Sequence, residues 1–102
     1  MSSHTIILLQ PTTSRNSRTW SDYDTVSKAM DGICNTFERK LKELNPNLRN
    51  ITYDIQDLYS YIDNMPDMSA LVYDAKMNAY IPCNKSWIKE RAFNHLKQQA
   101  GL

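Results

Sequence analysis

The chain has 102 residues, of which 41% are hydrophobic and 23% charged, and its formal net charge is +1. This length and composition predict one globular domain over residues 1–102 and exclude a disordered chain. A net charge this close to zero argues against a nucleic-acid binder that depends on phosphate contacts. Two cysteines, Cys34 and Cys83, are too few for a disulfide scaffold and match no metal-ligand spacing, so we expect free thiols.

The sequence contains no signal-peptide pattern and no apolar run that approaches the length of a membrane span. We therefore expect a soluble, intracellular protein.

The N-terminal run predicts a β-strand that is apolar on both faces. Strand alternation places Thr5, Ile7 and Leu9 on one face of a sheet, and Ile6 and Leu8 on the other. Both faces therefore need cover, and a chain this short has few elements to supply it. We expect a second copy of the protein to cover one face.

After a polar loop, the strongest periodic pattern of the chain predicts one long amphipathic helix. Thr19 and Asp22 resemble a capping box at its start, and Asn45 with Pro46 ends it. Its apolar stripe recurs at spacings of three and four and consists of Tyr23, Val26, Met30, Ile33, Phe37, Leu41 and Leu44. Such a stripe needs a partner surface, which we expect the sheet to supply.

The second half predicts a short strand, a helix, a hairpin and a last helix. The strand spans residues 51–53, and Asp54 caps the helix that follows. Segments 70–73 and 79–81 flank a turn and predict the hairpin, and Asn84 caps the last helix.

The predicted order is therefore β-α-β-α-β-β-α, with about four strands. This order indicates an α+β fold in which three helices pack on one face of an antiparallel sheet. The other face, with Ile6 and Leu8, stays bare, and we expect it to form a homodimer interface.

The sequence offers no catalytic motif. It lacks a glycine-rich phosphate loop, a nucleophile elbow and a metal-spaced Cys/His cluster, so we expect no enzymatic activity, no cofactor and no metal. His4 and His95 stand alone in the sequence and are expected to be structural. The alternative is an enzyme whose site is assembled across a dimer.

A flank of small residues beside the apolar stripe of the long helix points to peptide binding. It consists of Thr25, Ala29, Gly32 and Thr36. A mid-helix glycine costs about 1 kcal/mol relative to alanine, so Gly32 reflects either close approach of another chain or neutral drift at an exposed site. We expect a shallow trough between this helix and the sheet edge to take an extended segment with an apolar anchor.

Six segments resemble the enhancer of rudimentary homolog family: residues 3–12, 18–23, 45–47, 51–55, 71–73 and 84–90. The resemblance covers nearly the whole chain in register. It implies a small α+β protein, nuclear or nucleocytoplasmic, that forms homodimers through its sheet. Ile6 and Leu8 then map to the dimer seam.

The resemblance further implies an adaptor without enzymatic activity that binds short segments of RNA-processing factors, including those of microRNA maturation, RNA elimination and splicing. The trough beside the long helix is then the candidate partner site. We accordingly expect no direct nucleic-acid or membrane contact, and an intracellular location in which the nucleus is favoured and the cytoplasm is the alternative. The alternatives are a regulator or enzyme of pyrimidine or nucleotide metabolism, which the family's name suggests, and a direct RNA-binding module.

Thr19 is a candidate phosphorylation site, because Asp22 three residues on fits the pattern of acidophilic kinases. A helix cap explains the same two residues. Family members often carry a second such pattern around the position of Thr25, but Lys28 replaces the acid here.

Overall fold

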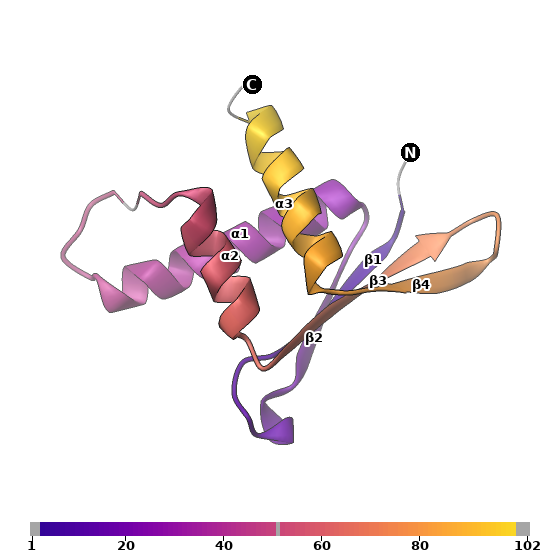
Figure 1. Cartoon of the computed structure of the whole chain (residues 1–102), viewed down its shortest axis with the longest axis horizontal. Helices are drawn as coiled ribbons and strands as arrows, with labels where there is room; N and C mark the ends of the chain where they lie inside the picture. The colour runs from indigo at the N-terminus through magenta and orange to yellow at the C-terminus, as the bar shows by residue number, and fades with distance from the viewer. Residues whose placement is uncertain (1–2, 51, 100–102) are drawn as a thin grey trace.

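A computed structural model of the chain describes residues 3–50 and 52–99. Over these residues it has one four-stranded antiparallel sheet and three α-helices, which confirms the predicted α+β class (Figure 1). In chain order the elements are β1 (Thr5–Gln10), a 3-10 turn η1 (Arg15–Ser17), β2 (Thr19–Tyr23), α1 (Val26–Leu44), α2 (Ile55–Asn64), β3 (Asp67–Asp74), β4 (Ala79–Cys83) and α3 (Lys85–Gln99).

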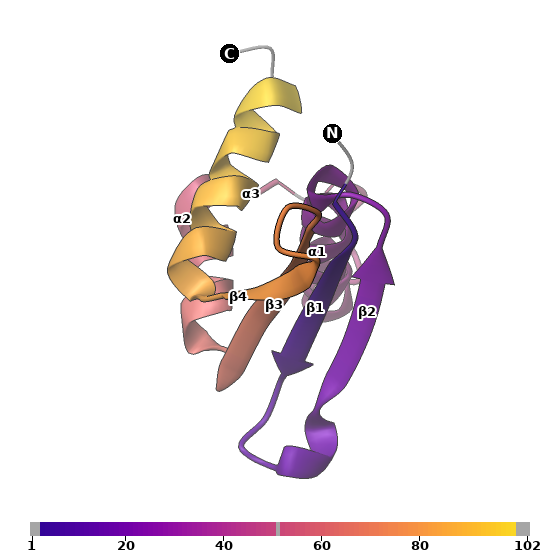
Figure 2. The same ribbon diagram turned by 90° about the vertical axis from the view of Figure 1, so that its right-hand side faces the viewer.

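The strands lie in the order β2-β1-β3-β4, so the N-terminal strand is central in the sheet. All three pairings are antiparallel, and the β1–β3 register places Thr5 opposite Val72. The helices lie on one side of this sheet, behind and beside it in Figure 2. The predicted arrangement of three helices on one sheet face is therefore confirmed.

The hydrophobic core lies between that face and the helices. Ile7 from β1 and Met68 and Ala70 from β3 are buried there, as alternation along the strands requires. The buried helical side chains are Ala29, Met30, Ile33, Cys34 and Phe37 of α1, Leu58 and Ile62 of α2, and Ile88 and Ala92 of α3. The face of the long helix that was predicted to be apolar is thus the face that it buries, with Met30, Ile33 and Phe37 in the core.

The start of that helix differs from the prediction. Thr19–Tyr23 forms strand β2, paired to β1, and is not a capping box. The helix begins at Val26, and its N-cap is Thr25, whose hydroxyl accepts a hydrogen bond from the backbone N–H of Lys28 at 3.0 Å. Two candidate caps lie six residues apart, and pairing with β1 satisfies the backbone of the first segment better than a helix end would.

The strand predicted at 51–53 is wrong for its described part. Residue 51 lies outside the described residues, while Thr52 and Tyr53 belong to no strand. The Tyr53 ring instead packs edge-on against Phe37, with ring centroids 4.9 Å apart. Tyr53 thus packs against the core from the connection between α1 and α2 and needs no strand to place it there.

The rest of the second half folds as predicted. Asp54 and Asp57 form a reciprocal capping box at the start of α2, at 3.0 and 3.1 Å. β3 and β4 form the predicted hairpin, whose turn places Asn78 at a φ of 51°. The side-chain oxygen of Asn84 accepts the backbone N–H of Trp87 at 2.9 Å, as an N-cap does.

Three acidic groups of the interior have raised pKa values. Burial, followed by the charges of Glu38 and Asp31, raises the pKa of the Cys34 thiol from 9.0 to about 11. Burial also raises the pKa of Tyr53, whose hydroxyl donates to Glu38 at 2.9 Å, and that of Tyr61. The fold therefore favours the neutral form of each group.

We expect the free energy of unfolding to fall as the pH rises from about 9 through about 11. The folded pKa of Cys34 lies above its unfolded value, so its contribution is complete below the unfolded pKa and is lost as the pH rises through the folded one. Urea titrations across this range test the prediction. Cys34→Ala should show a shallower decline, and an identical decline in both proteins would contradict the assignment.

Candidate interaction surfaces

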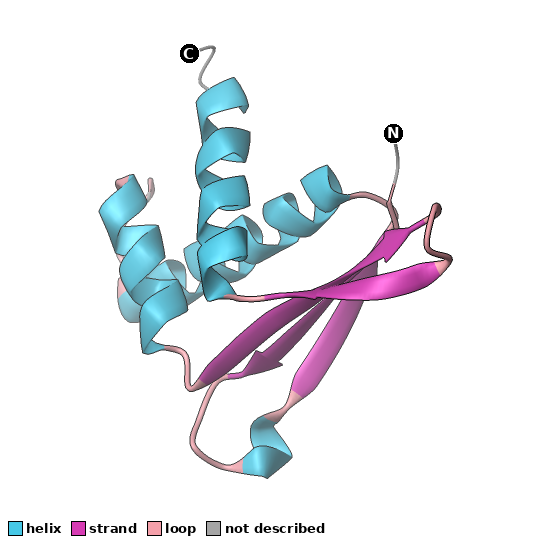
Figure 3. Cartoon of the chain, turned by 45° about the vertical axis from the view of Figure 1, so that its right-hand side comes forward, coloured by secondary structure: helices cyan, strands magenta, loops and turns pink. Residues whose placement is uncertain are grey.

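The side of the sheet away from the helices, which we call the open sheet face, carries a cluster of apolar and aromatic side chains. Cross-strand partners share a face, and the pairing places on this one Ile6, Leu8, Trp20, Asp22, Ser69, Leu71, Tyr73, Tyr80 and Pro82. Trp20 is 67% exposed and Tyr80 42%. No described element covers this face (Figures 2 and 3).

Ile6 and Leu8 lie at the middle of the open sheet face. Ile6 is opposite Leu71 and Leu8 is opposite Trp20, and both are half-buried. Strand alternation predicted that Ile6 and Leu8 share this face. Trp20 was not predicted there, because its segment was expected to start the long helix. In a strand, Trp20 and Asp22 would share one face and Ser21 and Tyr23 the other. This alternation is a weak signal for a strand, because most of the segment is polar.

A polar network borders one end of the open sheet face. His4 Nε2 is 2.8 Å from an Asp22 carboxylate oxygen and His4 Nδ1 is 2.7 Å from the Tyr80 hydroxyl. A carboxylate only accepts hydrogen bonds, so Nε2 donates to Asp22; in the neutral imidazole, Nδ1 then accepts from the Tyr80 hydroxyl. The network connects β2 and β4 across the two central strands.

Both histidines, isolated in the sequence, have side-chain partners in the fold. His95 on α3 has Nε2 2.5 Å from Asp31 Oδ1 on α1, and its Nδ1 is 3.4 Å from the Ser27 hydroxyl. The Gln99 amide donates to the same carboxylate at 3.1 Å. These contacts join α1 to α3, which accords with the structural role predicted for His95.

The basic side chains of α3 are largely engaged within the protein. Lys89 forms an ion pair with Asp63 at 2.9 Å and lies over the Tyr59 ring. The Arg91 guanidinium lies over the Trp87 ring, 5.3 Å from its centroid. This helix therefore presents no continuous basic stripe of the kind that follows a nucleic-acid backbone.

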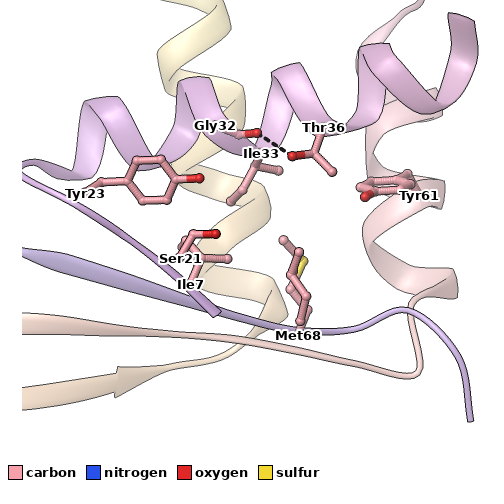
Figure 4. Close-up of a pocket in the computed structure, with 9 residues that line it drawn as sticks. Ile7, Ser21, Tyr23, Gly32, Ile33, Thr36, Tyr61 and Met68 are labelled. Carbon is pink, nitrogen blue, oxygen red and sulfur yellow. Dashed lines mark hydrogen bonds between the residues drawn. The ribbon is translucent and has the colours of Figure 1, made fainter. Parts of the chain in front are cut away.

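A shallow trough does lie between α1 and the sheet edge, beside Gly32 and Thr36 (Figure 4). It encloses about 30 Å³, which is room for about two water molecules. The Thr36 hydroxyl donates to the Gly32 carbonyl at 2.8 Å. The trough in this form admits no large side chain.

The four small residues predicted to line the partner site have internal roles. Thr25 caps α1, and Ala29 has no exposed surface, so a partner cannot contact it. A Cβ built on Gly32 would lie 2.3 Å from the Tyr23 hydroxyl. The glycine is therefore explained by close approach of Tyr23 in the same chain, rather than by another chain or by drift.

A larger groove lies next to the trough, between the C-terminal half of α1 and α2; we call it the α1–α2 groove. It encloses about 370 Å³ and shares Tyr61 with the trough. Phe37, Leu41, Leu44 and Met65 give it an apolar lining, and Leu44 is 68% exposed. The signal in the sequence was that the helical stripe runs on to Leu44.

Thr19, the candidate phosphorylation site, is exposed on edge strand β2. The helix-cap explanation for Thr19 and Asp22 therefore no longer applies. Within 3–50 and 52–99, no three His, Cys, Asp or Glu side chains are placed to hold a metal ion, and no helix is both long and apolar enough to cross a bilayer.

Comparison with known proteins gives one consistent result. The family model described as "Enhancer of rudimentary" matches residues 1–102. An enhancer of rudimentary homolog of Arabidopsis thaliana is 61% identical over 97% of this chain and 91% of its own length. The Dictyostelium discoideum homolog is 52% identical over 96% and 98%, and the Drosophila virilis protein enhancer of rudimentary is 47% identical over 96% and 94%.

The contact between Gly32 and Tyr23 yields a testable prediction. In an exposed helix, Gly→Ala stabilises by about 1 kcal/mol, but here the new methyl group must displace the Tyr23 ring. We expect Gly32→Ala to gain that stability in a Tyr23→Ala background and to lose most of it in the natural chain. Urea unfolding of the four proteins of this double-mutant cycle measures the coupling; equal gains in both backgrounds would contradict it.

Proposed function

Because the chain belongs to the enhancer of rudimentary family, we propose that it is a non-enzymatic, homodimeric adaptor. In this proposal it binds short peptide segments of RNA-processing or small-RNA pathway proteins and bridges them into complexes. The nucleus is the favoured compartment. The observation that carries the proposal is the uncovered apolar face of a sheet whose other face is packed with helices.

The open sheet face has the composition of an interface between copies. Its centre is apolar, with Ile6, Leu8 and Leu71, and its border is polar, with Asp22 and His4. Protein interfaces commonly have an apolar centre and a polar rim. A two-fold axis through the open sheet face would pack this face of one protomer against the same face of the other. A single interface would then cover the exposed apolar side chains of both sheets.

The peptide site belongs on the helical side, which such a dimer leaves free. The α1–α2 groove supports it better than the trough does, because its volume of about 370 Å³ accommodates an apolar anchor with flanking backbone. Gly32 and Thr36 then form the border of the site where the trough adjoins the groove. One groove on each protomer lets the dimer hold two partner copies and raises their avidity.

The dimer is tested with the double variant Ile6→Arg, Leu8→Arg. We expect it to be a folded monomer of 11.9 kDa, because two charges would be buried in an apolar seam. The unaltered chain should have twice that mass by light scattering. Gln56→Arg with Ser60→Arg adds the same charge to the exposed face of α2 and should leave the dimer intact. A dimeric seam variant, or a monomeric unaltered chain, would sink the sheet-to-sheet arrangement.

The groove is tested with Leu44→Glu, which places a charge in the apolar lining. Burial of a leucine anchor is worth about 2 kcal/mol, so we expect recovery of RNA-processing proteins in affinity purification with mass spectrometry to fall by about tenfold or more. Leu48→Glu is the matched control, because Leu48 is also exposed, at 51%, but lies outside the groove. Unchanged recovery with Leu44→Glu would reject the groove.

A further inference from the structure

A second large hollow lies under the β3–β4 hairpin, at the end of the sheet away from the α1–α2 groove. Val72, Ile81 and Cys83 form its floor, on the helix side of the hairpin, while Val26 of α1 and Trp87 of α3 form its walls. The hollow exists because the hairpin extends beyond the helices and α3 covers only its base (Figure 3). The hollow encloses about 600 Å³, a volume typical of ligand sites.

The charges around this hollow are mostly positive. Arg91 and Lys76 line it, and the Arg91 guanidinium is fixed over the Trp87 ring. Burial raises the pKa of the Cys83 thiol, and the charge of Arg91 opposes that rise. Val26 begins α1, so the positive end of that helix dipole also faces the hollow.

One carboxylate, that of Asp74, also lines the hollow. Its Oδ1 accepts the backbone N–H groups of Lys76 at 2.9 Å and Met77 at 3.3 Å, so its charge serves the hairpin turn. Among the described residues, neither Arg91 nor Lys76 forms a close ion pair with Asp74. The hollow therefore combines an apolar floor with a cationic rim.

We propose that this hollow binds an extended acidic peptide, with an apolar side chain seated on Val72, Ile81 and Trp87 and flanking carboxylates paired with Arg91 and Lys76. β4 has a neighbour on one side only in the described sheet, so its outer edge can pair with an extended peptide backbone. One arginine and one lysine suit a pair of carboxylates, whereas a nucleic-acid strand needs a longer cationic track. The site is separate from both the open sheet face and the α1–α2 groove.

The probe for this site is the peptide acetyl-Asp-Leu-Asp-amide, with acetyl-Asn-Leu-Asn-amide as its neutral match. Titration of the full chain, followed by nitrogen–proton NMR, should shift the backbone signals of Ile81 and the indole signal of Trp87. Saturating peptide should also slow alkylation of Cys83 by iodoacetamide, because that thiol is on the floor. We expect the neutral peptide to bind about tenfold more weakly, since it forms neither ion pair.

Variants separate this site from the rest of the molecule. Arg91→Glu and Lys76→Glu should each weaken the acidic probe several-fold. Lys97→Glu, on the same helix but outside the hollow, should not change it. Leu44→Glu should also leave it unchanged, so failure of the adaptor groove and failure of this site are distinguishable.

Three results would overturn the proposal: no shift at Ile81 or Trp87, equal binding of the acidic and neutral peptides, or tighter binding of a short oligouridylate than of the acidic peptide. The last result would assign the hollow to nucleic acid instead.

Discussion

The structure depends on a central strand that is apolar on both faces in a protein whose helices cover only one. β1 places Ile7 in the core and Ile6 and Leu8 on the opposite face. Because β1 lies between β2 and β3, its outer residues are at the middle of the sheet, where neighbouring strands contribute Trp20 and Leu71. The apolar patch therefore lies at the centre of the sheet and not at its edge.

The pattern of apolar residues was sufficient to predict most of the fold. The stripe of α1, the capping box at Asp54 and the β3–β4 hairpin depend on local spacing, which the sequence displays directly. β2 does not, because four of its five residues are exposed and it becomes a strand only through pairing with β1. The segment that begins at Thr19 is polar and resembles a helix N-cap, so only its pairing in the tertiary structure identifies it as a strand. The N-cap of α1 is Thr25 instead.

The residues of the interaction surfaces also divide into those that local sequence predicts and those that depend on tertiary structure. Ile6 and Leu8 followed from strand alternation, whereas Trp20 and Tyr80 join them through a cross-strand register that no local pattern encodes. The steric reason for Gly32, contact with the Tyr23 ring, comes from a neighbouring element whose path was not predicted. Grooves form between elements, so their volumes depend on packing angles that periodicity does not specify.

The position of β1 has a consequence for how the chain assembles during synthesis. Its partner on one side, β2, begins at Thr19, but its partner on the other side, β3, ends only at Asp74. The β1 segment of the nascent chain must therefore carry an unpaired edge and two apolar faces until β3 has been synthesised. Such long-range pairing slows folding and leaves the strand open to contact with other nascent chains. The risk of misassembly is thus concentrated in one six-residue strand.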